Sequence, residues 1–258
     1  MMTWGGALLG AMLVLFLGVP VALLIVAAHG GIPAQWAQDI ELRAALLRTA
    51  GTATVATVIG MMCGSPLAYL LARKRFLGRS LLAAIIDVPL LIPHPVAGIA
   101  ILLTVGRESG IGRLLLDLGV RVVGTPTGII VAMLFVAVPL YVSAAREAFA
   151  KVDTSYEIVA RTLGAAPWRV AYRITLPLAA RGLLSAAVVM WSRAVSEFGA
   201  VVVLTYNPKV VSILSYDRLT SAGLHEALPV AAIVIVLSLI PLTALRALRY
   251  ERDIETAL

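Results

Sequence analysis

The chain has 258 residues, of which 60% are hydrophobic and 14% are charged, and its formal net charge is +7. This much apolar surface is more than one soluble core can bury, so the composition excludes an ordinary soluble protein and indicates a multi-spanning membrane protein. In a soluble protein the positive charge would suggest nucleic acid, whereas in a membrane protein lysine and arginine gather on cytoplasmic loops. We therefore expect membrane lipid around the chain and no bound nucleic acid.

Six apolar segments are long enough to cross the roughly 30 Å hydrocarbon layer, which takes about 20 helical residues. Lipid offers no hydrogen-bond partners to the backbone, so each crossing segment should be helical, and the residue alternation of a membrane barrel is absent. The sequence predicts an all-α membrane protein with a single domain over residues 1–258. The predicted spans are approximately 4–28, 50–72, 81–104, 125–145, 179–205 and 227–248.

Lysine and arginine are distributed unevenly between the two predicted sides of the membrane. The connections at 73–80 and 146–181, together with the tail, contain 13 of these residues, and the opposite connections contain 7. The positive-inside rule places the first set in the cytoplasm. We therefore expect a multi-pass protein of the cell membrane with both termini and segment 146–181 in the cytoplasm.

The cytoplasmic segment 153–178 has the signals of a helix–turn–helix. Thr154 and Glu157 have capping-box spacing, which predicts that a helix begins near residue 155. Gly164 should end this helix, Pro167 suits the first turn of a second one, and Pro177 should bend or stop that second helix before it enters the membrane.

Apolar side chains on this short hairpin favour contact with another surface. They are Ile158, Val159, Leu163, Trp168 and Ile174. One alternative is a partner protein in the cytoplasm, and the other is a re-entrant elbow that packs on the chain's own spans.

The stretch "IVARTLGAAPWRVAYRITLP" resembles the EAA loop of ATP-binding-cassette importer permeases, whose pattern is E-A-A, three residues, G, nine residues, I-x-L-P. Ala160, Gly164, Ile174, Leu176 and Pro177 match in register. At the first two positions Ile158 and Val159 replace Glu and Ala, and Glu157 stands one place early. In this family the loop docks as a coupling helix into a cytoplasmic ATPase. The resemblance implies that role for Glu157, Ala160, Gly164, Ala165, Ile174 and Pro177.

Four further stretches resemble oxyanion importer permeases, especially the molybdate/tungstate branch. They are 87–102 ("DVPLLIPHPVAGIAIL"), 135–149, 191–208 ("WSRAVSEFGAVVVLTYNP") and 210–231. The resemblance implies a type I importer permease fold with six transmembrane helices and a cytoplasmic coupling helix. It also implies a second copy of the chain, two ATPase subunits that bind ATP and magnesium, and an extracytoplasmic oxyanion-binding protein. A sulfate permease is the alternative within this class, and a self-sufficient secondary transporter is the alternative outside it.

Motifs for catalysis or for cofactors are missing from the sequence. "GRESGIGR" at 106–113 has glycines but lacks the Lys-Ser/Thr of a phosphate-binding loop, and neither H-E-x-x-H nor G-x-S-x-G occurs. The three histidines, His29, His94 and His225, are far apart. We therefore expect a non-catalytic subunit that has no metal site and binds no cofactor of its own.

Two features inside the predicted spans are candidates for a transport pathway. Prolines interrupt the third span, and freed carbonyls should face protein or water, although an ordinary packed kink is an equal alternative. Arg193 and Glu197 have i, i+4 spacing in the fifth span, where an unpaired charge costs at least ~3 kcal/mol, so they should pair and face inward. Whether the pair fastens subunits or lines the pathway stays open. The predicted pathway residues are Pro93, Pro95, Arg193, Ser196, Glu197 and Gly199.

The charge asymmetry leads to a test of topology. Reporter fusions after Leu258 and within segment 153–176 should both report a cytoplasmic location, because both follow regions rich in lysine and arginine. An extracytoplasmic signal from either fusion would overturn the orientation.

Overall fold

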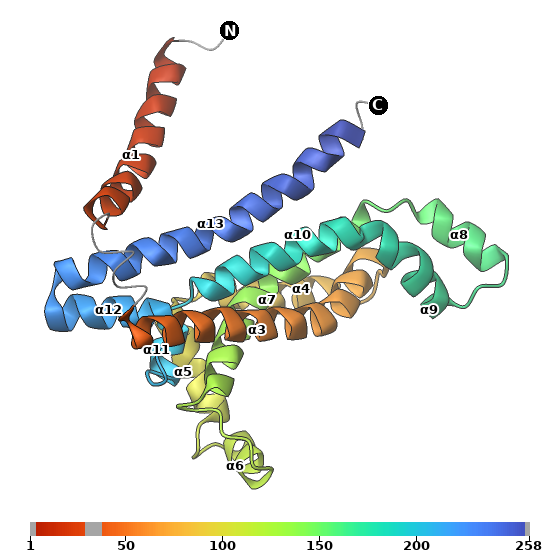
Figure 1. The fold of residues 1–258 in the computed structure, drawn as a ribbon. Helices are drawn as coiled ribbons and strands as arrows, with labels where there is room; N and C mark the ends of the chain where they lie inside the picture. The colour runs from red at the N-terminus through yellow and green to blue at the C-terminus, as the bar shows by residue number, and fades with distance from the viewer. Residues whose placement is uncertain (1–3, 29–37, 256–258) are drawn as a thin grey trace.

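The computed structural model of the chain describes residues 4–28 and 38–255, and within these ranges every regular element is helical (Figure 1). The prediction of an all-α fold is therefore confirmed. In chain order the elements are α1 (Trp4–Ala28), α3 (Ile40–Arg73), α4 (Arg79–Leu91), α5 (His94–Val105), α6 (Gly110–Asp117), α7 (Pro126–Ala150), α8 (Thr154–Thr162), α9 (Pro167–Val170), the π-helical turn η1 (Ala171–Thr175), α10 (Leu176–Val195), α11 (Gly199–Leu204), α12 (Val211–Ala222) and α13 (Leu224–Glu255).

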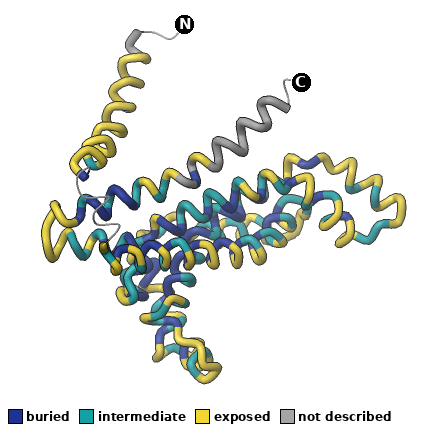
Figure 2. Tube along the Cα trace, in the orientation of Figure 1, coloured by how far each residue is buried: buried dark blue, intermediate teal, exposed yellow. Residues whose placement is uncertain are grey.

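Helices α3, α7 and α10 pack against one another and form the centre of the molecule, where most buried residues lie (Figure 2). The buried face of α3 consists largely of small residues that recur every three or four positions, including Ala53, Ala56, Gly60, Gly64 and Ala68. Small residues let helix backbones approach closely, which is how helices associate inside a membrane. A side chain at Gly60 would meet Met190, and one at Gly64 would meet Tyr141.

The described helices confirm some of the predicted membrane spans but do not establish that there are six. Four helices are long and apolar enough to cross a membrane: Gly6–Ala28, Ile40–Arg73, Pro126–Ala150 and Pro167–Val195. The α4–α5 pair makes a fifth span if the two helices cross as one. In α13 the apolar described stretch is Leu224–Leu239, and the side chains from residue 244 onward lie outside the described part. Six spans therefore stay a prediction.

Two predicted spans are not continuous helices. The third, 81–104, is divided at Ile92 and Pro93 into α4 and α5, which are bent by 115°. Ile92 is extended, with a ψ of 144°, and the proline that follows it disfavours the helical region at this position. The fifth span, 179–205, ends as a helix at Val195 and resumes at Gly199 as α11. Its prediction as one helix is wrong, because the buried carboxylate of Glu197 accepts a hydrogen bond from the Ala200 amide and so satisfies a backbone group where the helix is broken.

The two ends of the bundle carry different structures. The α8–α9 hairpin projects at the end where α3 finishes, and α12 lies at the end where α3 begins (Figure 1). α1 packs against α13 and exposes most of its apolar surface, as expected for a helix surrounded by lipid.

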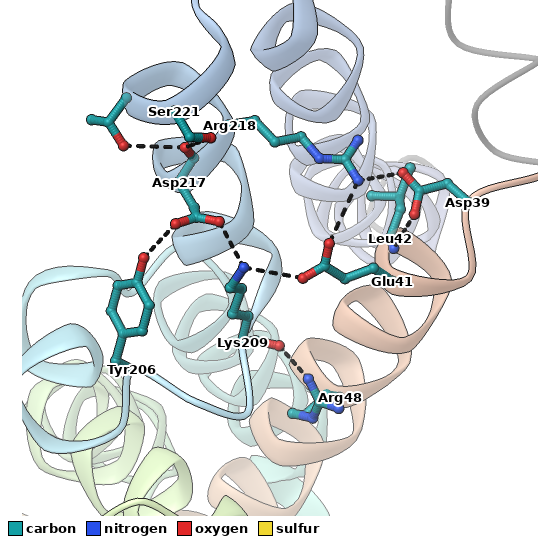
Figure 3. A network of polar contacts seen from close by, with 10 residues as sticks. Asp39, Glu41, Leu42, Arg48, Tyr206, Lys209, Asp217, Arg218 and Ser221 are labelled. Carbon is teal, nitrogen blue, oxygen red and sulfur yellow. Dashed lines mark hydrogen bonds and ion pairs between the residues drawn. The ribbon is translucent and has the colours of Figure 1, made fainter.

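A polar network joins the start of α3 to the segment before α12 and to α12 itself (Figure 3). The Lys209 ammonium lies 2.6 Å from an Asp217 oxygen and 3.1 Å from a Glu41 oxygen, and Arg218 pairs with Asp39. The hydrogen bond that Lys209 donates to Asp217 lowers the pKa of that carboxyl and raises the pKa of the Lys209 ammonium. This network fastens α12 to the beginning of α3.

Close packing of α5 on α11 generates a stability prediction. A methyl group at Gly98 would lie 2.8 Å from Cβ of Val203 and 2.9 Å from the carbonyl oxygen of Ala200, so backbone would have to move. We expect Gly98→Ala to destabilise the protein by about 1–3 kcal/mol, measured as a lower melting temperature in detergent. Gly51→Ala on α3 is the control, because a methyl group there meets nothing within 4 Å. Equal melting temperatures for the two variants would contradict this account of the packing.

Candidate coupling hairpin and pathway site

The α8–α9 hairpin begins differently from the prediction. Its N-cap is Asp153, whose carboxylate accepts a hydrogen bond from the Ser155 amide, and α8 starts at Thr154. Backbone hydrogen bonding to Ser155 lowers the pKa of the exposed Asp153 carboxyl. The predicted capping box of Thr154 and Glu157 is therefore wrong, because Asp153 takes the capping position and Glu157 is left free for another contact.

Gly164 ends α8 as predicted. Its φ is +87°, in the left-handed region that favours glycine. The Gly164 amide donates to the Arg161 carbonyl and the Ala165 amide to the Ala160 carbonyl, at 3.0 Å each, which is a Schellman ending. Pro167 then opens α9, also as predicted.

The hairpin exposes several large apolar side chains. Each of five is at least 57% exposed, and α8 contains no buried residue (Figure 2). They are Tyr156, Ile158, Val159, Leu163 and Trp168. Most of this surface is not covered by the chain's own spans, although Trp168 borders a hollow that Tyr69 of α3 also lines. A patch of this kind is typical of a surface that contacts another protein or a membrane.

Glu157 anchors the hairpin to the bundle instead of capping its helix. One carboxylate oxygen accepts hydrogen bonds from Arg73 Nε and from the Thr175 hydroxyl, at 2.8 Å each. Arg73 Nη2 also donates to the carbonyl of Val152, at 2.8 Å. The two charged side chains are only 10% and 12% exposed. The Arg73–Glu157 ion pair and its hydrogen bonds thus connect the end of α3 with α8, with the segment just before α8, and with the turn that leads into α10.

The remaining predicted coupling residues lie on the same hairpin or directly after it. Ala160, Ala165 and Ile174 are partly buried, and the Ala165 amide takes part in the helix ending. Pro177 is exposed near the start of α10. It does not stop the helix, because it lies in the first turn of α10, where the missing N–H of proline is tolerated, and the chain runs through the η1 turn into α10.

The second site is a cavity of about 570 Å³ at the two helix breaks, which is shallow and largely open to the outside. Its lining comes from the α4–α5 bend and from the α10–α11 break, so segments about 100 positions apart meet there. It contains five of the six predicted pathway residues, Pro93, Pro95, Arg193, Ser196 and Gly199. Gly199 is required at this contact, because a methyl group there would lie 2.7 Å from Cβ of His94.

The sixth residue, Glu197, lies beneath the cavity and is fully buried. Its Oε2 is 2.7 Å from Arg193 Nη2, so the predicted pair is present. Its Oε1 accepts a hydrogen bond of 2.8 Å from the Ala200 amide. Both carboxylate oxygens are therefore engaged, and the negative charge is held in one place below the cavity.

His94 completes this cluster, although the sequence did not indicate it. Arg193 Nη2 lies 2.7 Å from His94 Nε2, and His94 Nδ1 lies 3.6 Å from Glu197 Oε2. A lone histidine after Pro93 carries no spacing signal, and only the α4–α5 bend brings it to Arg193. Arg73 was missed for the same reason, because its partner Glu157 is 84 positions away. In the described part of the chain, no three histidine, cysteine or acidic side chains come together as metal ligands.

Solved structures share this arrangement of helices. A bacterial ATP-binding-cassette transporter involved in the import of the acidic polysaccharide alginate matches with a TM-score of 0.70 and 18% identity, covering 95% of this chain and 94% of that chain. This likeness shows that the chain has the fold of ATP-binding-cassette importer permeases.

Sequence comparisons then give the family. The family described as "binding-protein-dependent transport system inner membrane component" matches residues 60–250, so the chain belongs to this family of multi-pass membrane proteins. The chain is 36% identical over 235 residues to the molybdate/tungstate transport system permease protein WtpB of Thermococcus kodakarensis, covering 90% of each. It is 30% identical over 191 residues to a probable sulfate transport permease of Marchantia polymorpha, covering 72% of this chain and 66% of that one.

The Arg73 anchor makes a prediction about the hairpin. Arg73→Met removes the ion pair and the hydrogen bond to Val152. Losing a hydrogen bond to a charged group costs about 1.5 kcal/mol, so we expect hydrogen exchange of the α8 amides to accelerate roughly tenfold. Lys74→Met is the matched control, since the neighbouring lysine side chain is exposed. Unchanged exchange in Arg73→Met would show that the ion pair does not hold the hairpin.

Proposed function

We propose that this chain is the permease subunit of an importer for molybdate or tungstate. Two copies would form the pathway, two ATPase subunits would bind the hairpins, and an extracytoplasmic binding protein would deliver the anion. The curated relatives with 36% identity over nine-tenths of the chain favour molybdate or tungstate over sulfate, for which the relative covers less of the chain and is 30% identical.

The observation that carries this proposal is the α8–α9 hairpin. It combines an exposed apolar face with a firm anchor, whereas a self-sufficient secondary transporter has no use for such a surface. The positive charge of the surrounding connections favours a cytoplasmic position for it, on the side where an ATPase would lie.

The anchor suggests how ATP-driven motion would reach the pathway. Closure of the ATPase dimer on ATP would displace the bound hairpins. Because Glu157 ties each hairpin to Arg73 at the end of α3 and to Thr175 just before α10, these helices would move with it. α10 ends beside the cavity at Arg193 and Glu197. Displacement of the hairpin would therefore alter the pathway site, and hydrolysis, with ATP and magnesium on the partner, would reset it.

Co-purification from native membranes is the direct test. The chain should bring down an ATPase subunit, and vesicles containing the complex and its binding protein should accumulate molybdate or tungstate when supplied with ATP. A chain that transports without any ATPase would contradict the proposal, and accumulation of sulfate alone would select the alternative substrate.

Gly164 provides a test of coupling. Gly164→Val places a β-branched side chain at a φ of +87°, which costs about 1–2 kcal/mol, and adds bulk where the chain itself has open space. We expect this variant to insert normally but to lose most ATPase association and ATP-driven uptake.

Gly119→Val is the matched control. Gly119 also has a positive φ, of +79°, and open space around it, but it follows α6 at a distance from the hairpin (Figure 1). The Gly119→Val variant should have the same backbone strain and should still associate with the ATPase subunit. Equal loss in both variants would attribute the effect to strain alone, and full uptake by Gly164→Val would show that this hairpin is not the coupling element.

A further inference from the structure

The cavity lies where two broken helices meet. Unpaired backbone at membrane depth is stable only where protein covers it or where it lines a water-filled space. Two breaks from distant parts of the chain face one shallow, largely open hollow of about 570 Å³, larger than the roughly 30 Å³ that one water occupies. A small hydrated ion therefore has room there.

We propose that the Arg193 guanidinium at this cavity is a transit site for a tetrahedral divalent oxyanion, with the Ser196 hydroxyl as a second donor. This inference rests on the proposed function and adds the side chains that the anion contacts. Arg193 lines the cavity and is 20% exposed, and Ser196 lines it beside Arg193. Glu197 and His94 are positioning residues that hold the guanidinium.

The contacts of Arg193 leave donors for a ligand. Nη2 engages both Glu197 and His94, while Nη1 is 3.4 Å from the Ser196 hydroxyl, which is a long hydrogen bond. A guanidinium has five N–H donors in a rigid fork that suits oxyanions. The Ser196 hydroxyl can also rotate towards an anion, since its present acceptor is the Arg193 carbonyl at 3.1 Å.

Glu197 explains why such a site would release its ion. An unpaired arginine in a region of low dielectric would hold a divalent anion strongly and slow transport. The fully buried carboxylate at 2.7 Å cancels most of this attraction, and its second oxygen is fixed by the Ala200 amide. The site then orients the anion by hydrogen bonding without retaining it through net charge.

Protection of a cysteine from labelling tests occupancy directly. The assembled complex would carry Cys63→Ala, to remove the native thiol, and Leu91→Cys, because Leu91 lines the cavity and is 82% exposed. Sodium tungstate should slow labelling by a neutral maleimide, and sodium chloride of equal ionic strength should not. Leu103→Cys is the matched control, since Leu103 on α5 is 75% exposed and does not line the cavity. Its labelling should not respond to tungstate.

Three variants decide which side chain is responsible. Glu197→Gln keeps an oxygen for the Ala200 amide but removes the negative charge, so half-maximal protection should need at least tenfold less tungstate while uptake falls. Arg193→Met, and Arg193→Met combined with Glu197→Gln, should both lose protection. The double variant contains no unpaired buried charge, so it should assemble even if the single variants do not.

Equilibrium dialysis of tungstate against the same complexes provides a second measurement that needs no cysteine. Tungstate bound by the wild type and lost in the double variant supports the site. Equal binding by wild type and double variant, or unchanged affinity in Glu197→Gln, overturns it. Failure of the proposed function is recognised separately, because the wild-type complex would then lack an ATPase or import no oxyanion.

Discussion

The contacts of one buried carboxylate, Glu197, hold the middle of this structure together. One oxygen accepts from the Ala200 amide at the start of α11, and the other pairs with Arg193 at the end of α10 and lies 3.6 Å from His94 on α5. The Ser212 hydroxyl donates to the Glu197 carbonyl and adds α12 to the same point. A buried charge and a backbone amide without a hydrogen-bond partner are both costly in a membrane. Here the Glu197 carboxylate accepts a hydrogen bond from the Ala200 amide, so each group satisfies the other.

The long helices connect this centre with both ends of the molecule. α3 begins in the polar network with α12, packs in the centre against α7 and α10, and finishes at the Arg73 anchor. α10 follows the hairpin and ends beside the cavity. Densely packed interiors transmit displacement, so these two helices are the physical connection between the hairpin and the proposed anion site.

The departure from the EAA pattern has a structural explanation. Glu157 stands one position early, and this places its carboxylate towards Arg73 and Thr175 rather than among the exposed apolar side chains. The usual acidic position is taken by Ile158, which is 59% exposed. The hairpin therefore combines an internal ionic anchor with an apolar outer face.

Composition and short-range pattern were enough to predict the helical membrane class, the continuous spans over 4–28 and 125–145, the Gly164 ending, and the Arg193–Glu197 pair, because each depends on residues within a few positions of one another. The 115° bend, the break after α10, and the partners His94 and Arg73 required the tertiary structure. Sequence spacing could not indicate the contacts of His94 and Arg73, since they join segments about 80 to 100 positions apart and arise only when distant helices pack together. The prolines predicted that the third span is interrupted, but the bend angle depends on how the two helices pack.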